Sequence, residues 1–133
     1  RVISESVSKL NLLAEIFRKT GGTHIAALYS REGRPVVFAE DVGRYNAVDR
    51  VIGAGALSNV DFGETFLALS GRINGKMVFK AARLGIPLVA SISAALNSGV
   101  DTAREVGITL IGFVRDKTMN VYTYPERIVD IKV

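Results

Sequence analysis

The stretch ETFLALSGRINGKMVFKAARLGIPLVASIS, residues 64–93, decides the fold class of this chain. Residues 64–70 form a short apolar run typical of a buried β-strand, and residues 74–84 show helical apolar spacing that ends at Gly85. A second apolar run follows at residues 87–93. A strand, a helix and a further strand in this order predict a βαβ unit, whose two strands are parallel and lie in one sheet.

The segments on either side of this unit continue the alternation of strands and helices. Two apolar runs, residues 24–29 and 35–39, are joined by a short turn and predict a β-hairpin. The other predicted elements are helices over residues 6–19, around 47–52 and over 98–106, and strands at 108–114 and 119–124. We therefore expect one α/β domain over residues 1–133, with a mixed sheet covered by helices on both faces.

The composition excludes several kinds of functional site. The 133 residues contain no cysteine and one histidine, so the chain has no disulfide, no thiolate nucleophile and no Cys-ligated or multi-histidine metal site. No apolar run approaches the roughly 18–20 residues of a membrane span, and we expect a cytoplasmic protein without a membrane partner. The net charge of +4 suits a polyanionic ligand. Nucleic acid is not expected, because no basic stripe alternates with aromatic residues.

Three polar turns follow predicted strands, at residues 40–46, 70–75 and 91–99. In open α/β sheets ligands bind beyond the carboxyl ends of the strands, so we expect these turns to share one edge and hold a phosphate or carboxylate group. The candidate binding residues are Asp41, Arg44, Asn46, Ser70, Arg72, Ser91 and Ser93. The alternative is structural: Ser and Asn cap helices, Gly residues form turns, and the arginines lie in solvent.

Other polar residues near these turns have competing interpretations. Glu40 and Asp41 are unsuited to act as an acid–base pair, because adjacent residues of a strand point to opposite faces. Asp41 is expected to cap the next helix or bind Arg44, and Asp49 to bind Arg44 or a neighbouring turn. His24, at the head of a strand, either donates to a ligand or is a structural histidine. No residue of the chain is predicted to be catalytic.

Several motifs carry a family resemblance from about residue 8 to residue 128. They are EDVGRYNAVDRVIG (40–53), TGGTHIAALY (20–29), SGRINGKMVFKAARLGIPLV (70–89), SISA (91–94), GITLIGFVR (107–115) and NVYTYPERI (120–128). Together, and in their order along the chain, they resemble the formate dehydrogenase accessory protein family, FdhD/NarQ. The resemblance implies a cytidine deaminase-like, three-layer α/β/α fold. Deaminase chemistry is not implied, because its zinc site needs a cysteine pair that this chain lacks.

The resemblance also implies a function. Members of the family accept sulfur from a cysteine desulfurase on a Cys-x-x-Cys loop and pass it to a molybdenum or tungsten bis-pterin guanine dinucleotide cofactor, which then enters formate dehydrogenase. GDP is expected to act as a partial mimic of that cofactor, and a homodimer is expected. The family's cofactor-binding positions correspond here to Phe113, Val114, Arg115, Asp116, Lys117 and Thr118.

The chain departs from the family pattern in two places. The Cys-x-x-Cys loop precedes the first predicted helix in the family and is not in this sequence, so we expect a C-terminal part of a longer protein. The alternative is a cysteine-free scaffold that binds the nucleotide or cofactor without sulfur transfer. Tyr45 stands where the family usually has histidine, and its phenol titrates near pH 10, so a charge-dependent role of that histidine is not carried over.

Overall fold

A six-stranded mixed sheet organises the computed structural model, which describes residues 2–10, 24–115 and 117–128. The strands are β1 (His24–Ser30), β2 (Pro35–Asp41), β3 (Thr65–Leu69), β4 (Leu88–Ser91), β5 (Thr109–Gly112) and β6 (Asn120–Val121). Their order across the sheet is β2-β1-β3-β4-β5-β6. β3, β4 and β5 are parallel, whereas β1, β2 and β6 pair antiparallel with their neighbours, which confirms the expected mixed sheet.

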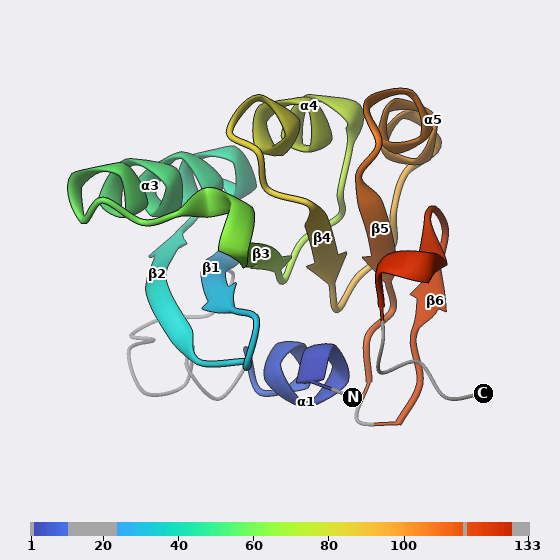
Figure 1. Ribbon diagram of the computed structural model, residues 1–133, viewed down its shortest axis with the longest axis horizontal. Helices are drawn as coiled ribbons and strands as arrows, with labels where there is room; N and C mark the ends of the chain where they lie inside the picture. Colours follow the sequence, from blue (N-terminus) through green and yellow to red (C-terminus); the bar gives the residue numbers. More distant parts are fainter. Residues whose placement is uncertain (1, 11–23, 116, 129–133) are drawn as a thin grey trace.

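Helices cover the sheet on both faces (Figure 1). α3 (Arg44–Leu57), α4 (Gly75–Arg83) and α5 (Asn97–Val106) lie on one face, and α1 (Val2–Ser8) lies on the other. Every residue of β3, β4 and β5 is buried, as expected for central strands packed on both sides. The three-layer arrangement predicted from the sequence is confirmed.

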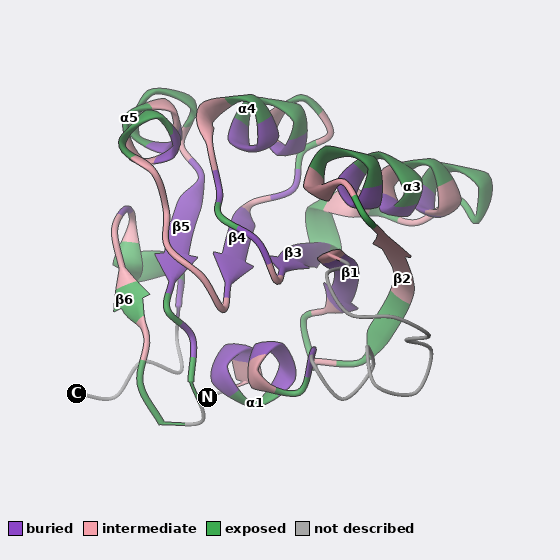
Figure 2. Ribbon diagram, turned by 180° about the vertical axis from the view of Figure 1, so that it is seen from behind, coloured by how far each residue is buried: buried purple, intermediate pink, exposed green. Residues whose placement is uncertain are grey.

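The two faces of the sheet carry separate apolar clusters. Figure 2 shows the strands between them, β3, β4 and β5, as buried. The larger cluster joins the inward sides of α3, α4 and α5 to residues such as Leu28, Leu67 and Leu110. On the opposite face Ile3 and Val7 of α1 belong to the second cluster. Alternate residues of each strand point to opposite faces, which is why neighbouring strand residues divide between the two clusters.

Local signals set the ends of the βαβ helix as predicted. α4 begins after Asn74, whose side-chain oxygen accepts a hydrogen bond from the Met77 backbone N–H at 3.1 Å. It ends next to Gly85, which has a φ of +82°. α5 likewise ends at Gly107, whose φ is +83°. These caps stop both helices without a clash from a β-carbon.

Several predicted boundaries were wrong. The strand predicted at 87–93 is only Leu88–Ser91, because the Ser91 hydroxyl accepts the Ser93 N–H and turns the chain. The strand predicted at 119–124 is only Asn120–Val121, because the Thr123 hydroxyl takes over the bond from the Leu110 N–H. The helix predicted over residues 6–19 is interrupted, because α1 spans Val2–Ser8 and a turn follows at Lys9; residues 11–19 of that prediction lie outside the described residues. Within the described ranges, no helix is long and apolar enough to cross a membrane.

Candidate functional site

The sheet topology brings the three polar turns to one edge. β1 is antiparallel to both β2 and β3, so β2 runs in the same direction as β3 and β4. The turns that follow these three strands therefore leave the same side of the sheet, as predicted. His24, the first residue of β1, pairs with Asp41 at the end of β2 and also lies at this edge.

Hydrogen bonds join the turns to one another. The Ile25 N–H donates to the Ser70 hydroxyl at 2.9 Å, which links the start of β1 to the turn after β3. The Ser91 hydroxyl donates to the Gly71 carbonyl at 2.6 Å and so links the turns after β3 and β4. The segment after β5 is joined to the turn after β4 in the same way, because the Phe113 N–H donates to the Ser93 carbonyl at 2.9 Å. These hydrogen bonds join four segments distant in sequence, and the turn after β2 lies beside them through the pairing of Asp41 with His24. We call the surface that these five ranges form the loop edge: residues 24, 40–46, 70–75, 91–96 and 113–115.

The serines of the loop edge act mainly as structural braces. The Ser91 side chain is fully buried, and its hydroxyl both donates to Gly71 and accepts from the Ser93 N–H. The Ser70 hydroxyl accepts the Ile25 N–H. Both hydroxyls bond to backbone, but neither caps a helix as the structural alternative expected, and ligand binding by these serines stays a prediction. Ser93 contributes its backbone carbonyl to the same network.

A close backbone approach explains a glycine at the loop edge. A β-carbon on Gly71 would lie 3.0 Å from Nδ1 of His24, which is tighter than ordinary van der Waals contact. The absence of a side chain lets the turn after β3 lie against the start of β1. His24 is half-buried beside this turn, and its role toward a ligand stays a prediction.

Two carboxylates of residues 40–53, those of Asp41 and Asp49, have partners other than those predicted. Asp41 accepts from the Gly43 N–H at 3.1 Å and lies 3.4 Å from the Arg50 guanidinium, so its predicted pairing with Arg44 was wrong. Asp41 is also not the helix cap, because α3 begins after Gly43. The backbone hydrogen bond from Gly43, followed by the contact with Arg50, lowers the pKa of Asp41 below its ordinary value. Asn46, which is exposed, also bonds to Asp41.

Asp49 was likewise assigned the wrong partner. It forms an ion pair with Lys80 of α4, whereas Arg44 lies over the Tyr45 ring with its guanidinium carbon 5.4 Å from the ring centre. Arg44 and Asp49 are five positions apart, which places them about 140° apart around a helix of 3.6 residues per turn. The prediction failed because this rotation directs the Asp49 carboxylate toward the neighbouring helix.

The segment after β5 divides into buried and exposed residues. Phe113 has 42% of its surface exposed and adopts a φ of +51°, an unusual conformation for a residue with a side chain. Val114 is buried, so its side chain packs in the core, and a contact with the cofactor through its backbone stays a prediction. Arg115 is exposed, and its guanidinium donates to the carbonyls of Ile92 and Val114 at 2.8 and 2.9 Å. Lys117 and Thr118 are exposed, and Asp116 lies outside the described residues.

The loop edge therefore combines rigid backbone with accessible cations. Arg72 and Arg115 are exposed, and Arg44 is half-buried. Lys117, shortly after Arg115 in the chain, is also exposed. Exposed guanidinium groups suit the bidentate recognition of phosphate, and an exposed aromatic ring such as Phe113 offers a stacking surface for a planar base. No group of three or more His, Cys, Asp or Glu side chains among the described residues could hold a metal ion.

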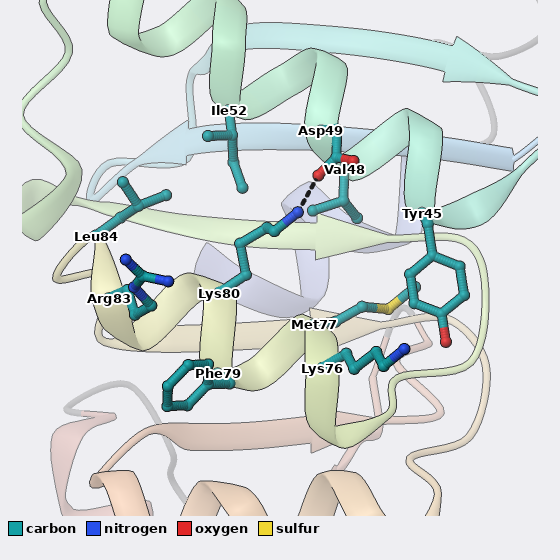
Figure 3. Close-up of a pocket in the computed structure, with 10 residues that line it drawn as sticks. All are labelled: Tyr45, Val48, Asp49, Ile52, Lys76, Met77, Phe79, Lys80, Arg83 and Leu84. Carbon is teal, nitrogen blue, oxygen red and sulfur yellow. Dashed lines mark hydrogen bonds and ion pairs between the residues drawn. The ribbon is translucent and has the colours of Figure 1, made fainter.

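One contact at the start of α3 was not foreseen. The side-chain amide of Asn74 donates to the hydroxyl of Tyr45, and this hydrogen bond lowers the pKa of Tyr45. The Asn74 side chain carries an amide group besides the oxygen that caps α4, and that amide is available to a second partner. Nearby, a cavity of about 530 Å³ lies between α3 and α4 (Figure 3). Of the loop-edge residues, only Tyr45 lines this cavity, so it is distinct from the predicted site.

Comparisons with known proteins agree with the fold and the motifs. A model of the FdhD/NarQ family matches residues 1–129. A protein of Methanothermobacter thermautotrophicus named sulfur carrier protein FdhD is 47% identical over 116 residues, covering 87% of this chain and 46% of that protein. A protein of the same name from Sulfolobus acidocaldarius is 44% identical and covers 96% of this chain and 51% of its own length. The chain thus spans about half the length of the relatives it matches.

Solved structures show the same relationship. A crystal structure from Desulfotalea psychrophila described as a formate dehydrogenase accessory protein has a TM-score of 0.86 and 33% identity, covering 96% of this chain and 57% of that chain. A dCMP deaminase from the cyanophage S-TIM5 has a TM-score of 0.62 and 13% identity, covering 83% of this chain and 96% of that one. At that identity the deaminase shows a shared fold alone, and the deaminase-like prediction for the fold is confirmed.

Proposed function

The chain belongs to the FdhD/NarQ family, and from that premise we propose that it is the cofactor-holding part of an accessory protein for formate dehydrogenase maturation. Its cargo would be a molybdenum or tungsten bis-pterin guanine dinucleotide, with a guanine nucleotide end lying on the loop edge. The observation that carries this proposal is the loop edge itself. Hydrogen bonds fix four segments on one side of the sheet, and exposed cations extend from that side.

The residues of the loop edge fit such a cargo. A pyrophosphate carries several negative charges, and Arg72, Arg44 and Arg115 supply guanidinium donors for them. Phe113 is exposed enough to contact a planar ring. Because buried hydroxyls and backbone bonds hold the turns in place, little order would have to be created when the ligand binds.

Sulfur transfer would use groups outside these residues. A persulfide requires a cysteine, and this chain has none. In the proposed function, a cysteine desulfurase would therefore load sulfur onto a part of the protein other than this chain, while the loop edge holds the cargo. The enzyme that finally receives the cargo would be formate dehydrogenase. A cytoplasmic homodimer is part of the same proposal, and sedimentation at micromolar concentration tests the dimer.

Calorimetric titration with GDP tests the nucleotide site. Arg72→Ala should weaken GDP binding by about 1–3 kcal/mol, or roughly 5- to 150-fold, because a hydrogen bond to a charged group is lost. Arg104→Ala is the matched control, since Arg104 is an exposed arginine on α5. It should change the affinity less than about twofold. Equal GDP affinity in the wild-type chain and Arg72→Ala would show that the nucleotide does not lie on this edge.

Two further measurements sharpen the result. Arg115→Ala should weaken GDP binding to a similar degree, and it should also loosen the chain after β5, because its guanidinium bonds to the Ile92 and Val114 carbonyls. Single-stranded DNA serves as a polyanion control. Tight binding of DNA without any binding of GDP would contradict the proposed function.

A further inference from the structure

α3 and α4 leave a groove between them because they pack on different parts of the sheet. α3 packs on β1 and β2, whereas α4 packs along α5. The groove has a volume of about 530 Å³, and Figure 3 shows side chains from both helices around it. We call it the helix groove, and its lining residues are Tyr45, Val48, Asp49, Ile52, Lys76, Met77, Phe79, Lys80, Arg83 and Leu84.

The helix groove has an apolar floor and walls. Val48 and Met77, each only 2% exposed, form part of the floor. Ile52 and Leu84 are half-buried, and Phe79 has 52% of its surface exposed. A large aromatic side chain left half in water beside an apolar groove is a feature of surfaces that bury further apolar groups on binding.

Cations follow one another along the α4 side of the groove. Lys76, Lys80 and Arg83 occupy positions i, i+4 and i+7, so they lie on one face of the helix in successive turns. The distance along the axis from the first to the last is about 10 Å at 1.5 Å per residue. Asp49 is the single carboxylate among the lining residues, so the groove carries an excess of positive charge.

The ion pair across the groove is easily exchanged. Asp49 and Lys80 connect α3 to α4 (Figure 3), and their side chains are 52% and 49% exposed. Exposed ion pairs contribute little to stability, so a carboxylate from a ligand can replace Asp49 beside Lys80 at small cost. The groove is therefore accessible to a ligand that brings both apolar and acidic groups.

We propose that the helix groove binds an acidic amphipathic helix of a partner protein. The apolar face of that helix would lie on Ile52, Leu84 and Phe79, which keep accessible surface, and acidic side chains one turn apart would face the cations of α4. The spacing of the charges favours a helix over a small anion, because the three cations are distributed along two turns and do not converge on one point. This partner site goes beyond the proposed nucleotide site and shares only Tyr45 with the loop edge.

A designed peptide tests the proposal. The probe is a fluorescein-labelled, amidated 15-residue helix with Leu at i, i+4 and i+7 and Glu on the flanking positions, and its binding is followed by fluorescence anisotropy. Arg83→Glu should weaken binding about tenfold or more, because a cation facing the peptide becomes an anion. Arg104→Glu is the matched control, since Arg83 and Arg104 are both exposed and lie in the last turns of adjacent helices. It should change binding less than about twofold.

Two further arms separate the contributions of charge and apolar contact. A peptide with Gln in place of Glu should bind at least about tenfold more weakly, and Phe79→Ser should also weaken binding of the acidic peptide. Phe79 is half-exposed, so this substitution should leave the fold intact, which circular dichroism checks. GDP binding should be the same in Arg83→Glu as in the wild-type chain, which keeps this test independent of the nucleotide site.

Several results would overturn the proposal. Equal losses of peptide affinity in Arg83→Glu and Arg104→Glu would mean that binding depends only on the net charge of the chain. Absence of binding at millimolar peptide would exclude a helix-binding groove. Displacement of the peptide by GDP would assign it to the loop edge. If anilinonaphthalene sulfonate bound in an Arg83-dependent way while the peptide did not, the groove would be a small-anion site. Conversion of a dimer to a monomer by Arg83→Glu would make the groove a contact between two copies.

Discussion

Replacing Ser91 by Ala tests the brace that joins the turns of the loop edge. The Ser91 hydroxyl is buried, donates to the Gly71 carbonyl at 2.6 Å and accepts the Ser93 N–H at 2.9 Å. Alanine removes both hydrogen bonds while leaving the backbone free to keep its conformation. The substitution therefore measures the brace itself, with little contribution from lost packing volume.

The expected loss of stability follows from these two bonds. A hydrogen bond in a folded protein contributes about 1 kcal/mol net, and a buried polar group left without a partner costs about 1–3 kcal/mol. Loss of the hydroxyl leaves the Gly71 carbonyl and the Ser93 N–H without this hydrogen-bond partner. We expect Ser91→Ala to lower the free energy of unfolding by about 2–4 kcal/mol, a large part of the 5–15 kcal/mol typical of a domain.

Urea unfolding followed by circular dichroism provides the measurement. The free energy of unfolding of a small domain falls by about 2 kcal/mol for each molar of urea. The expected loss of stability should therefore lower the urea concentration at the midpoint of unfolding by about 1–2 M. Ser98→Ala is the matched control, because the Ser98 hydroxyl accepts the Gly75 N–H at 3.2 Å on the exposed surface. It should cost less than about 1 kcal/mol. A loss of less than 0.5 kcal/mol in Ser91→Ala would refute the reasoning that this hydroxyl holds the two turns together.

Three other predictions concern stability. Burial raises the pKa of Tyr29 to about 12 from its usual 10.0, so the unfolded chain loses this proton first. Stability should therefore fall between pH 10 and 12, and Tyr29→Phe, compared with wild type, should remove that part of the pH dependence. A β-carbon on Gly99 would lie 2.7 Å from the Ile73 carbonyl oxygen, so Gly99→Ala should destabilise by about 1–3 kcal/mol. Gly53→Ala, in a helix with open space around it, should instead stabilise by about 0.5–1 kcal/mol, and chemical denaturation distinguishes the two signs.

Backbone patterns and local caps were predictable because they depend on neighbours in the chain. The apolar run of β3, the Asn74 cap of α4 and the glycine after that helix are local signals, and all three lie where predicted. Placement of the three polar turns on one edge followed from the parallel direction of the strands that precede them. The family was also predictable, because its motifs are defined by the sequence alone.

Side-chain partners were the main failure. Asp41 bonds to Arg50, although it had been expected to cap the next helix or bind Arg44. Asp49 bonds to Lys80, although it had been expected to bind Arg44 or a neighbouring turn. Partner choice depends on the rotation of each helix and on the distance between neighbouring elements, which a local pattern does not contain.

The sequence by itself determined the α/β class, the order of most elements and the polar edge, because hydrophobic periodicity and turn chemistry act over a few residues. Only the tertiary structure decided that the Ser70 and Ser91 hydroxyls brace backbone, and that α3 and α4 stand apart with a cationic groove between them. These features join residues 20 to 45 positions apart, as Ser91 joins Gly71 and Ser70 joins Ile25. Such contacts exist only after the sheet has placed the segments side by side.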